Sequence, residues 1–75
     1  MSERLDAVAE AYDAIAAELE QALAHLRVAA GHYRNELVPR GAAHAWAARG
    51  HLLAAGALLD AQAREHARNA VADPG

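Results

Sequence analysis

Four residue types are absent from this 75-residue sequence: cysteine, threonine, lysine and phenylalanine. Without cysteine the chain has neither a disulfide nor a thiolate ligand for a metal ion. Ser2, next to the N-terminus, carries the only aliphatic hydroxyl, so nucleophilic catalysis by a hydroxyl or a thiol has no suitable residue. The five glycines stand singly, which excludes a glycine-rich loop that binds phosphate. We therefore expect a protein that is not an enzyme.

Segments that could direct the chain to a membrane are also lacking. The sequence begins with polar and charged residues rather than with a basic segment followed by an apolar run, so no secretory signal is expected. The stretch 42–61 is rich in alanine and leucine, but His44, Arg49, His51 and Asp60 interrupt it. These features predict a cytoplasmic protein with no membrane partner.

Apolar residues recur at alternating steps of three and four in the first half of the chain, which is the spacing of one face of an amphipathic helix. This stripe consists of Leu5, Val8, Tyr12, Ile15, Leu19, Ala22, Leu26, Ala29 and Tyr33, with Leu23 and Leu37 at its edges. Ser2 has the side chain of a good N-cap, and Glu3 and Asp6 place negative charge near the positive end of the helix dipole. We predict a first helix over about 2–37.

Pro39 marks the expected boundary between two helices. Proline disfavours helical geometry in the residue before it, here Val38, and is tolerated as an early residue of a new helix. We predict a turn at 38–41, a second helix over about 42–71 and a frayed tail at 72–75. This all-α arrangement is an antiparallel helical hairpin. The alternative is a single long helix kinked at Pro39, which would leave both apolar stripes in water.

The second helix is apolar on nearly every side, and such a helix is normally covered on nearly every side. A single domain of this length, residues 1–75, seldom buries enough apolar surface to be stable without further support. We predict that the hairpin assembles into a four-helix bundle or larger homo-oligomer, at least a dimer, with the second helix at its centre. The residues predicted to form this oligomer interface are Trp46, Arg49, Leu52, Leu53, Gly56, Leu58 and Leu59.

Charge is unevenly distributed along the chain, whose formal net charge is −3. Residues 1–20 contain six carboxylates and one arginine, whereas residues 21–51 contain four arginines and one glutamate. In a hairpin the turn end is therefore basic and the open end is acidic. This pattern predicts a dimer with the turns at opposite ends. Four arginines are too few for a nucleic-acid surface, and the helices are too long for a helix-turn-helix domain, so nucleic acid is not expected as a partner.

Four of the five histidines are placed symmetrically about the centre of the chain. His25 and His32 are seven residues apart and precede Pro39, and His44 and His51 have the same spacing and follow it. Folding at the turn would bring His25 level with His51 and His32 level with His44. On the helical wheel all four lie beside the apolar stripes, flanking the core. They either converge in the groove between the helices or point to opposite edges of the hairpin.

Converging histidines would provide two imidazoles at each level, which is half of a tetrahedral zinc or copper site or the two axial ligands of a haem. Histidines seven residues apart are separated by about 10 Å along one helix, so neither helix can chelate a metal ion alone. Diverging histidines would instead be solvated surface residues. A helical metal or haem carrier is therefore the alternative function.

The function that the sequence favours is that of a non-enzymatic interaction protein. In this interpretation a homo-oligomeric bundle serves as an assembly subunit, an adaptor or a neutralising partner of another protein. No cofactor is expected for such a role.

Overall fold

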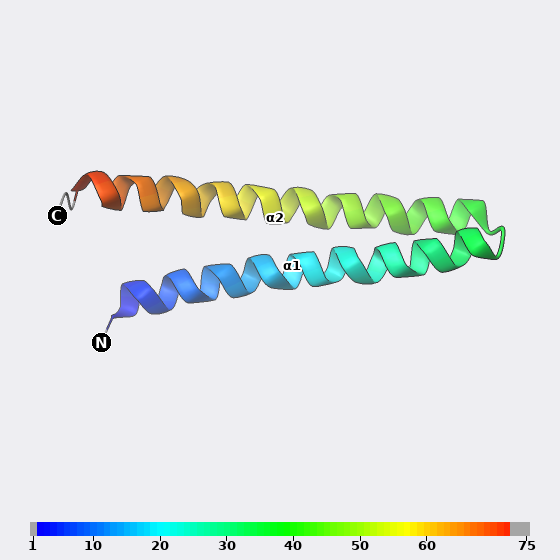
Figure 1. Cartoon of the computed structure of the whole chain (residues 1–75), viewed down its shortest axis with the longest axis horizontal. Helices are drawn as coiled ribbons and strands as arrows, with labels where there is room; N and C mark the ends of the chain where they lie inside the picture. Colours follow the sequence, from blue (N-terminus) through cyan, green and yellow to red (C-terminus); the bar gives the residue numbers. More distant parts are fainter. Residues whose placement is uncertain (1, 73–75) are drawn as a thin grey trace.

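The chain folds into two long antiparallel helices that lie side by side (Figure 1). The computed structural model describes residues 2–72, with α1 spanning Glu3–Arg34 and α2 spanning Val38–Ala72. No strand occurs within residues 2–72, and the molecule is a rod of 57 × 22 × 14 Å. The predicted hairpin is confirmed, and the alternative of one kinked helix is wrong. Of the predicted tail, residue 72 ends α2, and residues 73–75 lie outside the described part of the chain.

The start of α1 has the predicted cap. The Ser2 Oγ accepts a hydrogen bond of 3.2 Å from the backbone N–H of Leu5. This bond satisfies one of the four N–H groups that the first turn of an α-helix leaves without a partner. Glu3 and Asp6 lie in the same turn, where their charges stabilise the positive end of the helix dipole.

The turn between the helices occupies residues 35–37. The backbone N–H of Leu37 donates to the carbonyl of His32 at 2.8 Å, and that of Glu36 donates to the carbonyl of Tyr33 at 3.0 Å. These two bonds form a Schellman motif, which ends a helix by placing one residue in the left-handed region of backbone conformation. That residue is Glu36, whose φ is 61°.

The predicted turn at 38–41 is therefore wrong, because the Schellman motif ends α1 before Pro39 is reached. α2 begins at Val38. The first helical hydrogen bond of α2 runs from the N–H of Gly41 to the carbonyl of Leu37, at 2.9 Å. Pro39 thus lies in the first turn of α2, where its missing N–H costs no helical hydrogen bond. The effect of proline on the preceding residue is a preference, and here it does not prevent Val38 from starting the helix.

The seam between the helices is lined mainly by small side chains, with one isoleucine among its buried residues. Its buried residues are Ile15, Ala22 and Ala29 on α1 and Ala48 and Ala55 on α2. They recur every seven residues, so they form one row on each helix. Gly41 is also buried and extends the α2 row to the turn end, where a Cβ atom would lie 2.6 Å from ring carbons of Tyr33. Small side chains therefore allow the two helices to approach closely along the seam.

Helical geometry places the neighbours of the buried residues on two different sides of the seam. Residues three positions after a buried one lie on one side of its row, and residues four positions after it lie on the other. Because the helices are antiparallel, the two +3 rows flank one groove and the two +4 rows flank the opposite one. The +3 rows include His25 and His51, and the +4 rows include Leu26 and Leu52. The hairpin therefore has two faces of different chemistry.

The predicted apolar stripe of the first helix is not centred on the seam. Its members Ile15, Ala22 and Ala29 are buried, and Val8 is half-buried. Its other large members are exposed, namely Leu5, Tyr12, Leu19, Leu26 and Tyr33. The helices pack through the smaller members of the stripe, so the leucines and tyrosines lie outside the seam.

Replacing Glu36 with glycine is expected to stabilise the hairpin. A side chain in the left-handed region costs roughly 1 kcal/mol, a penalty that glycine does not have. Glu36→Gly should therefore raise the free energy of unfolding by about 1 kcal/mol, measured by urea denaturation followed by far-ultraviolet circular dichroism. In the matched control Glu20→Gly, within the exposed surface of α1, the same change should lower stability by about 1 kcal/mol. Destabilisation by Glu36→Gly would contradict the described turn.

Candidate functional site: a histidine groove and an apolar face

The +3 rows bring charged and titratable side chains together along one side of the hairpin. We call this region the histidine groove, and its members are Glu18, His25, His32, His44 and His51. The imidazole rings alternate between the helices in the order His32, His44, His25, His51. Successive ring centroids are 5.3, 5.3 and 5.5 Å apart, and the rings of His25 and His51 are stacked at 14°. The four half-buried rings thus form one continuous ladder.

Of the two possible arrangements of the histidines, the structure contains the convergent one. The pairs expected to be level, His25 with His51 and His32 with His44, are both in ring contact. A contact between His25 and His44 joins these two pairs. This contact was not predicted, because the symmetry of the sequence places His25 level with His51 and not with His44. The histidines flank the core as expected, because all four are half-buried beside the buried residues of the seam. Their rings meet across the groove.

Glu18 binds the last ring of the ladder. The Nδ1 atom of His51 donates a hydrogen bond of 2.7 Å to Oε2 of Glu18, and each side chain is 33% exposed. A carboxylate oxygen only accepts hydrogen bonds, so the Nδ1 atom of His51 must carry a proton. In its neutral form His51 is therefore the Nδ1–H tautomer, with Nε2 unprotonated. No sequence motif marks Glu18 as a site residue, although its position seven residues before His25 places it on the same row.

The central rings of the ladder share a second hydrogen bond. The Nδ1 atoms of His25 and His44 are 3.0 Å apart. One of these nitrogens donates and the other accepts, so at least one of the two imidazoles is neutral. Two ring nitrogens from different helices therefore face one another within the groove.

The groove does not by itself provide a complete metal cage. Among residues 2–72, no three histidine, cysteine, aspartate or glutamate side chains are grouped so that they could hold a metal ion. Haem does not fit between His25 and His44 of one hairpin. The iron and the porphyrin plane must lie between two axial imidazoles, whereas these two rings are in direct contact.

The opposite side of the hairpin is apolar. The +4 rows carry seven large residues that are each between 45 and 59% exposed, and we call this surface the apolar face: Leu5, Tyr12, Leu19, Leu26, Tyr33, Leu52 and Leu59. Five of the seven come from the predicted apolar stripe of α1, which was expected to be buried in the hairpin. Despite this surface, neither helix within residues 2–72 has a segment long and apolar enough to cross a bilayer.

The residues predicted to form an oligomer interface are all exposed in the hairpin. Leu52 and Leu59 belong to the apolar face, whereas Leu58 continues the +3 row beyond His51. The remaining members lie away from the seam: Trp46, Arg49, Leu53 and Gly56. The Arg49 guanidinium is 5.0 Å from the centre of the Trp46 ring, a cation–π contact within the same helix.

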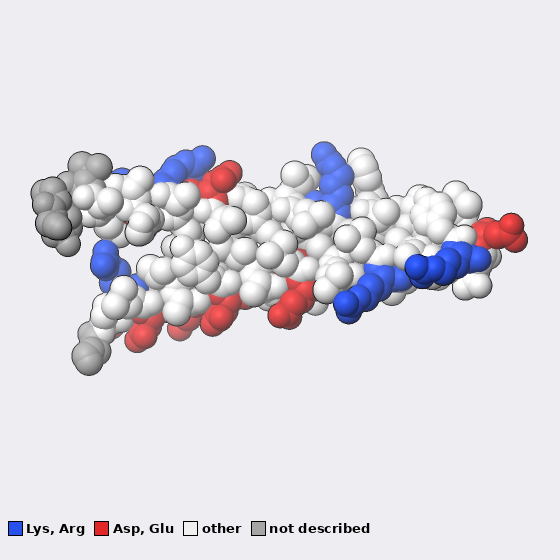
Figure 2. Space-filling model, in the orientation of Figure 1, with Lys and Arg blue, Asp and Glu red and all other residues white. Residues whose placement is uncertain are grey.

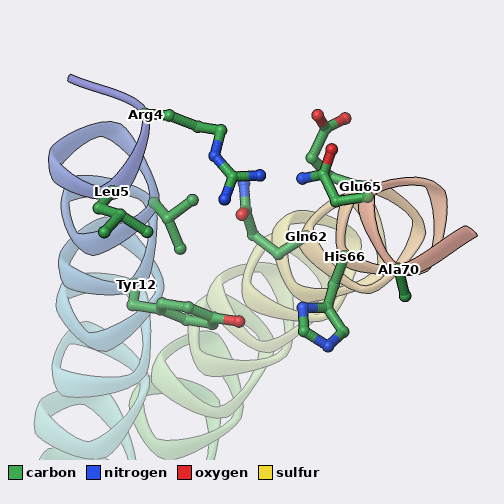
Figure 3. A pocket seen from close by; sticks show the side chains of 9 residues that line it. Arg4, Leu5, Tyr12, Gln62, Glu65, His66 and Ala70 are labelled. Atoms are coloured by element: carbon green, nitrogen blue, oxygen red, sulfur yellow. The ribbon is translucent and has the colours of Figure 1, made fainter. Parts of the chain in front are cut away.

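A cleft of about 430 Å³ opens between the helices at the end of the hairpin where the termini lie (Figure 3). Its α1 wall is largely apolar and consists of Leu5, Val8 and Tyr12, and its α2 wall includes Gln62, Glu65, His66 and Asn69. Arg4 extends from α1 toward Gln62, and the hydroxyl of Tyr12 points toward His66 (Figure 3). The cleft forms because the helices diverge toward this end (Figure 1).

Figure 2 shows that the charged side chains are segregated along the rod, as the sequence predicts. Carboxylates gather on α1 toward the open end, and arginines gather toward the turn. The exposed carboxylates are Glu3, Asp6, Glu10, Asp13 and Glu20, and the exposed arginines near the turn are Arg27, Arg34 and Arg40. The two ends of the hairpin therefore carry opposite charge.

Comparisons with known proteins give no match for this chain. It matches no protein-family model, no curated protein and no solved structure. The histidine groove, the apolar face and the open-end cleft are therefore the features from which a function is proposed.

The Glu18 contact predicts an unusual tautomer for one histidine. In long-range ¹H–¹⁵N spectra at a pH where the histidines are neutral, His51 should be protonated on Nδ1, whereas free imidazole side chains favour Nε2. Glu18→Ala should restore the ordinary tautomer of His51 because the acceptor is lost. Glu20→Ala removes a nearby carboxylate that faces solvent and should leave the spectrum of His51 unchanged. An Nε2–H tautomer in the wild-type chain would contradict the described hydrogen bond.

Proposed function

We propose that this chain is a non-enzymatic assembly protein, and that its hairpin pairs with a second copy through the apolar face to build a four-helix bundle. The apolar face itself is the observation that supports this function. Each of its seven large side chains is about half exposed. Burying the exposed half of such a side chain contributes on the order of 1 kcal/mol. Seven of them together are comparable with the stability of a whole small domain, about 5–15 kcal/mol.

A second copy suits this surface because the hairpin is complementary to itself. Its open end is acidic and contains a cleft with an apolar wall. Its turn end is basic and carries the exposed apolar residues Tyr33, Leu37 and Val38. When two hairpins pack with their turns at opposite ends, each turn end meets the open end of the other copy. Arginines then approach carboxylates, and apolar side chains approach the cleft.

The two kinds of contact have different roles in this assembly. Exposed ion pairs contribute only about 0–1 kcal/mol each, and salt screens them. We therefore assign the affinity to the apolar face and the orientation of the two copies to the charges. The opposite orientation would place the arginines of both turns together.

Another apolar surface is available for further contacts. Trp46 is 72% exposed and Leu53 is 57% exposed on the outer side of α2. In a dimer formed through the apolar face, these residues would lie outside the contact between the copies. They provide a place for additional copies or for a different protein, in keeping with a role as a subunit, an adaptor or a neutralising partner.

The substitution Leu19→Glu is expected to weaken self-association about tenfold or more, because a carboxylate at the middle of the apolar face would lose its hydration in the interface. Ala17→Glu is the matched control, since it adds the same charge to the same helix on the side away from the apolar face. Sedimentation velocity over about 1–100 μM should show dimers or larger species for the wild type and Ala17→Glu, and a shift toward monomer for Leu19→Glu. A wild-type chain that is monomeric throughout this range would refute the proposal.

The orientation of the copies is tested with engineered cysteines, because the chain has none of its own. Tyr33→Cys should form no interchain disulfide under mild oxidation, since Tyr33 lies at the turn end of the apolar face and turns at opposite ends would place its two copies about 40 Å apart. Leu19→Cys is the positive control, because the middle of the α1 part of the apolar face meets its counterpart when the turns are at opposite ends. Efficient crosslinking of Tyr33→Cys at low salt and low protein concentration would show that the turns lie together.

A further inference from the structure

We propose that His25 and His44 form a binding site for copper(II) or nickel(II) in the histidine groove. The site rests on the two Nδ1 atoms that face each other from different helices at 3.0 Å. It is independent of the proposed assembly, because the groove lies on the side of the hairpin opposite the apolar face. The groove is also accessible in part, since both imidazoles are half-buried.

The distance between the two nitrogens fits a metal ion with bonds at right angles. With metal–nitrogen bonds of about 2.0–2.1 Å, nitrogens 3.0 Å apart subtend an angle of about 95° at the metal. A tetrahedral ion such as zinc requires about 109°, and hence nitrogens about 3.3–3.4 Å apart. Neighbouring positions of a square-planar ion are 90° apart, and this geometry with nitrogen and oxygen ligands is typical of copper(II) and nickel(II).

Binding requires a proton shift within the pair and a turn of the two rings, because lone pairs that share a hydrogen bond along the N–N line must converge on an ion beside that line. In the metal-free pair, one Nδ1 atom carries the proton of the shared hydrogen bond. In the metal complex, both Nδ1 lone pairs bind the ion, and the former donor carries its proton on Nε2 instead. No proton is released when both rings are neutral. A protonated imidazole cannot bind the ion, so the affinity falls as the solution is acidified.

The other members of the ladder act as positioning residues for the two ligands. The ring of His51 stacks on that of His25 and is itself held by Glu18, and the ring of His32 packs against that of His44. These contacts restrict the rotation of both ligand rings before a metal ion arrives. Since the described residues provide no third ligand, water occupies the other coordination positions and the site is open.

The experiment is a calorimetric titration of the full, tag-free chain with copper(II) and, separately, nickel(II) at neutral pH. We expect one ion per chain, with binding lost on mild acidification. The electron paramagnetic resonance spectrum of the copper complex should show coupling to two imidazole nitrogens. His25→Ala and His44→Ala should each weaken binding about tenfold or more. Removing a residue that merely orients a metal ligand already lowers affinity by about tenfold or more, and removing the ligand itself should lower it at least as much. His66→Ala is the control, because His66 is the histidine outside the ladder, and it should leave the affinity unchanged.

Three results of the calorimetric titrations would overturn the site. They are the absence of saturable binding to the wild-type chain at about 100 μM, an affinity that survives both His25→Ala and His44→Ala, and an equal loss in His66→Ala. The resonance spectrum is recorded on the wild-type chain, so it tests the site even if a histidine variant folds poorly. A copper spectrum without coupling to two imidazole nitrogens would also overturn it.

Discussion

The close packing of two helices through alanine is the constraint on which the rest of this structure depends. The four alanines of the seam, Ala22, Ala29, Ala48 and Ala55, leave little width between the backbones, and the larger Ile15 is buried beyond them on the side of the open end. The leucines and tyrosines that would fill the core of a larger domain are therefore displaced to one side of the seam. The same close approach brings imidazoles from opposite helices into ring contact on the other side.

Two surfaces of different chemistry follow from this single seam. The apolar face lies along the +4 rows and has an unfavourable exposure to water that a second hairpin would relieve. The histidine groove lies along the +3 rows, where Glu18 and four imidazoles satisfy one another through hydrogen bonds and ring contacts. Because the two surfaces lie on opposite sides, association through one leaves the other accessible. A chain of this size could thus combine a structural role with metal binding.

The parts of the fold that depend on neighbours in the sequence could be predicted from it. The alternation of three and four along α1, the N-cap at Ser2 and the role of Pro39 at the start of α2 all involve contacts within a turn or two of helix. The pairing of His25 with His51 and of His32 with His44 also follows from sequence, because an antiparallel hairpin pairs residues symmetrically about its turn. The place of the turn could not be predicted in the same way. Glu36 adopts a left-handed conformation that glycine usually occupies, so the residue type gave no sign of it.

The sequence by itself thus determined two amphipathic helices, their antiparallel arrangement, the level of each histidine along the rod and the opposite charges of its two ends. Only the tertiary structure decided which side of each helix faces the other. An apolar stripe of alternating threes and fours contains two rows, and periodicity alone does not distinguish the row that enters the seam from the row that lies outside it. Side-chain size determines which row enters the seam, because small residues allow the backbones to approach and large ones do not. That choice, made between residues far apart in the sequence, exposed Leu19 and Leu52 and brought His25 against His44.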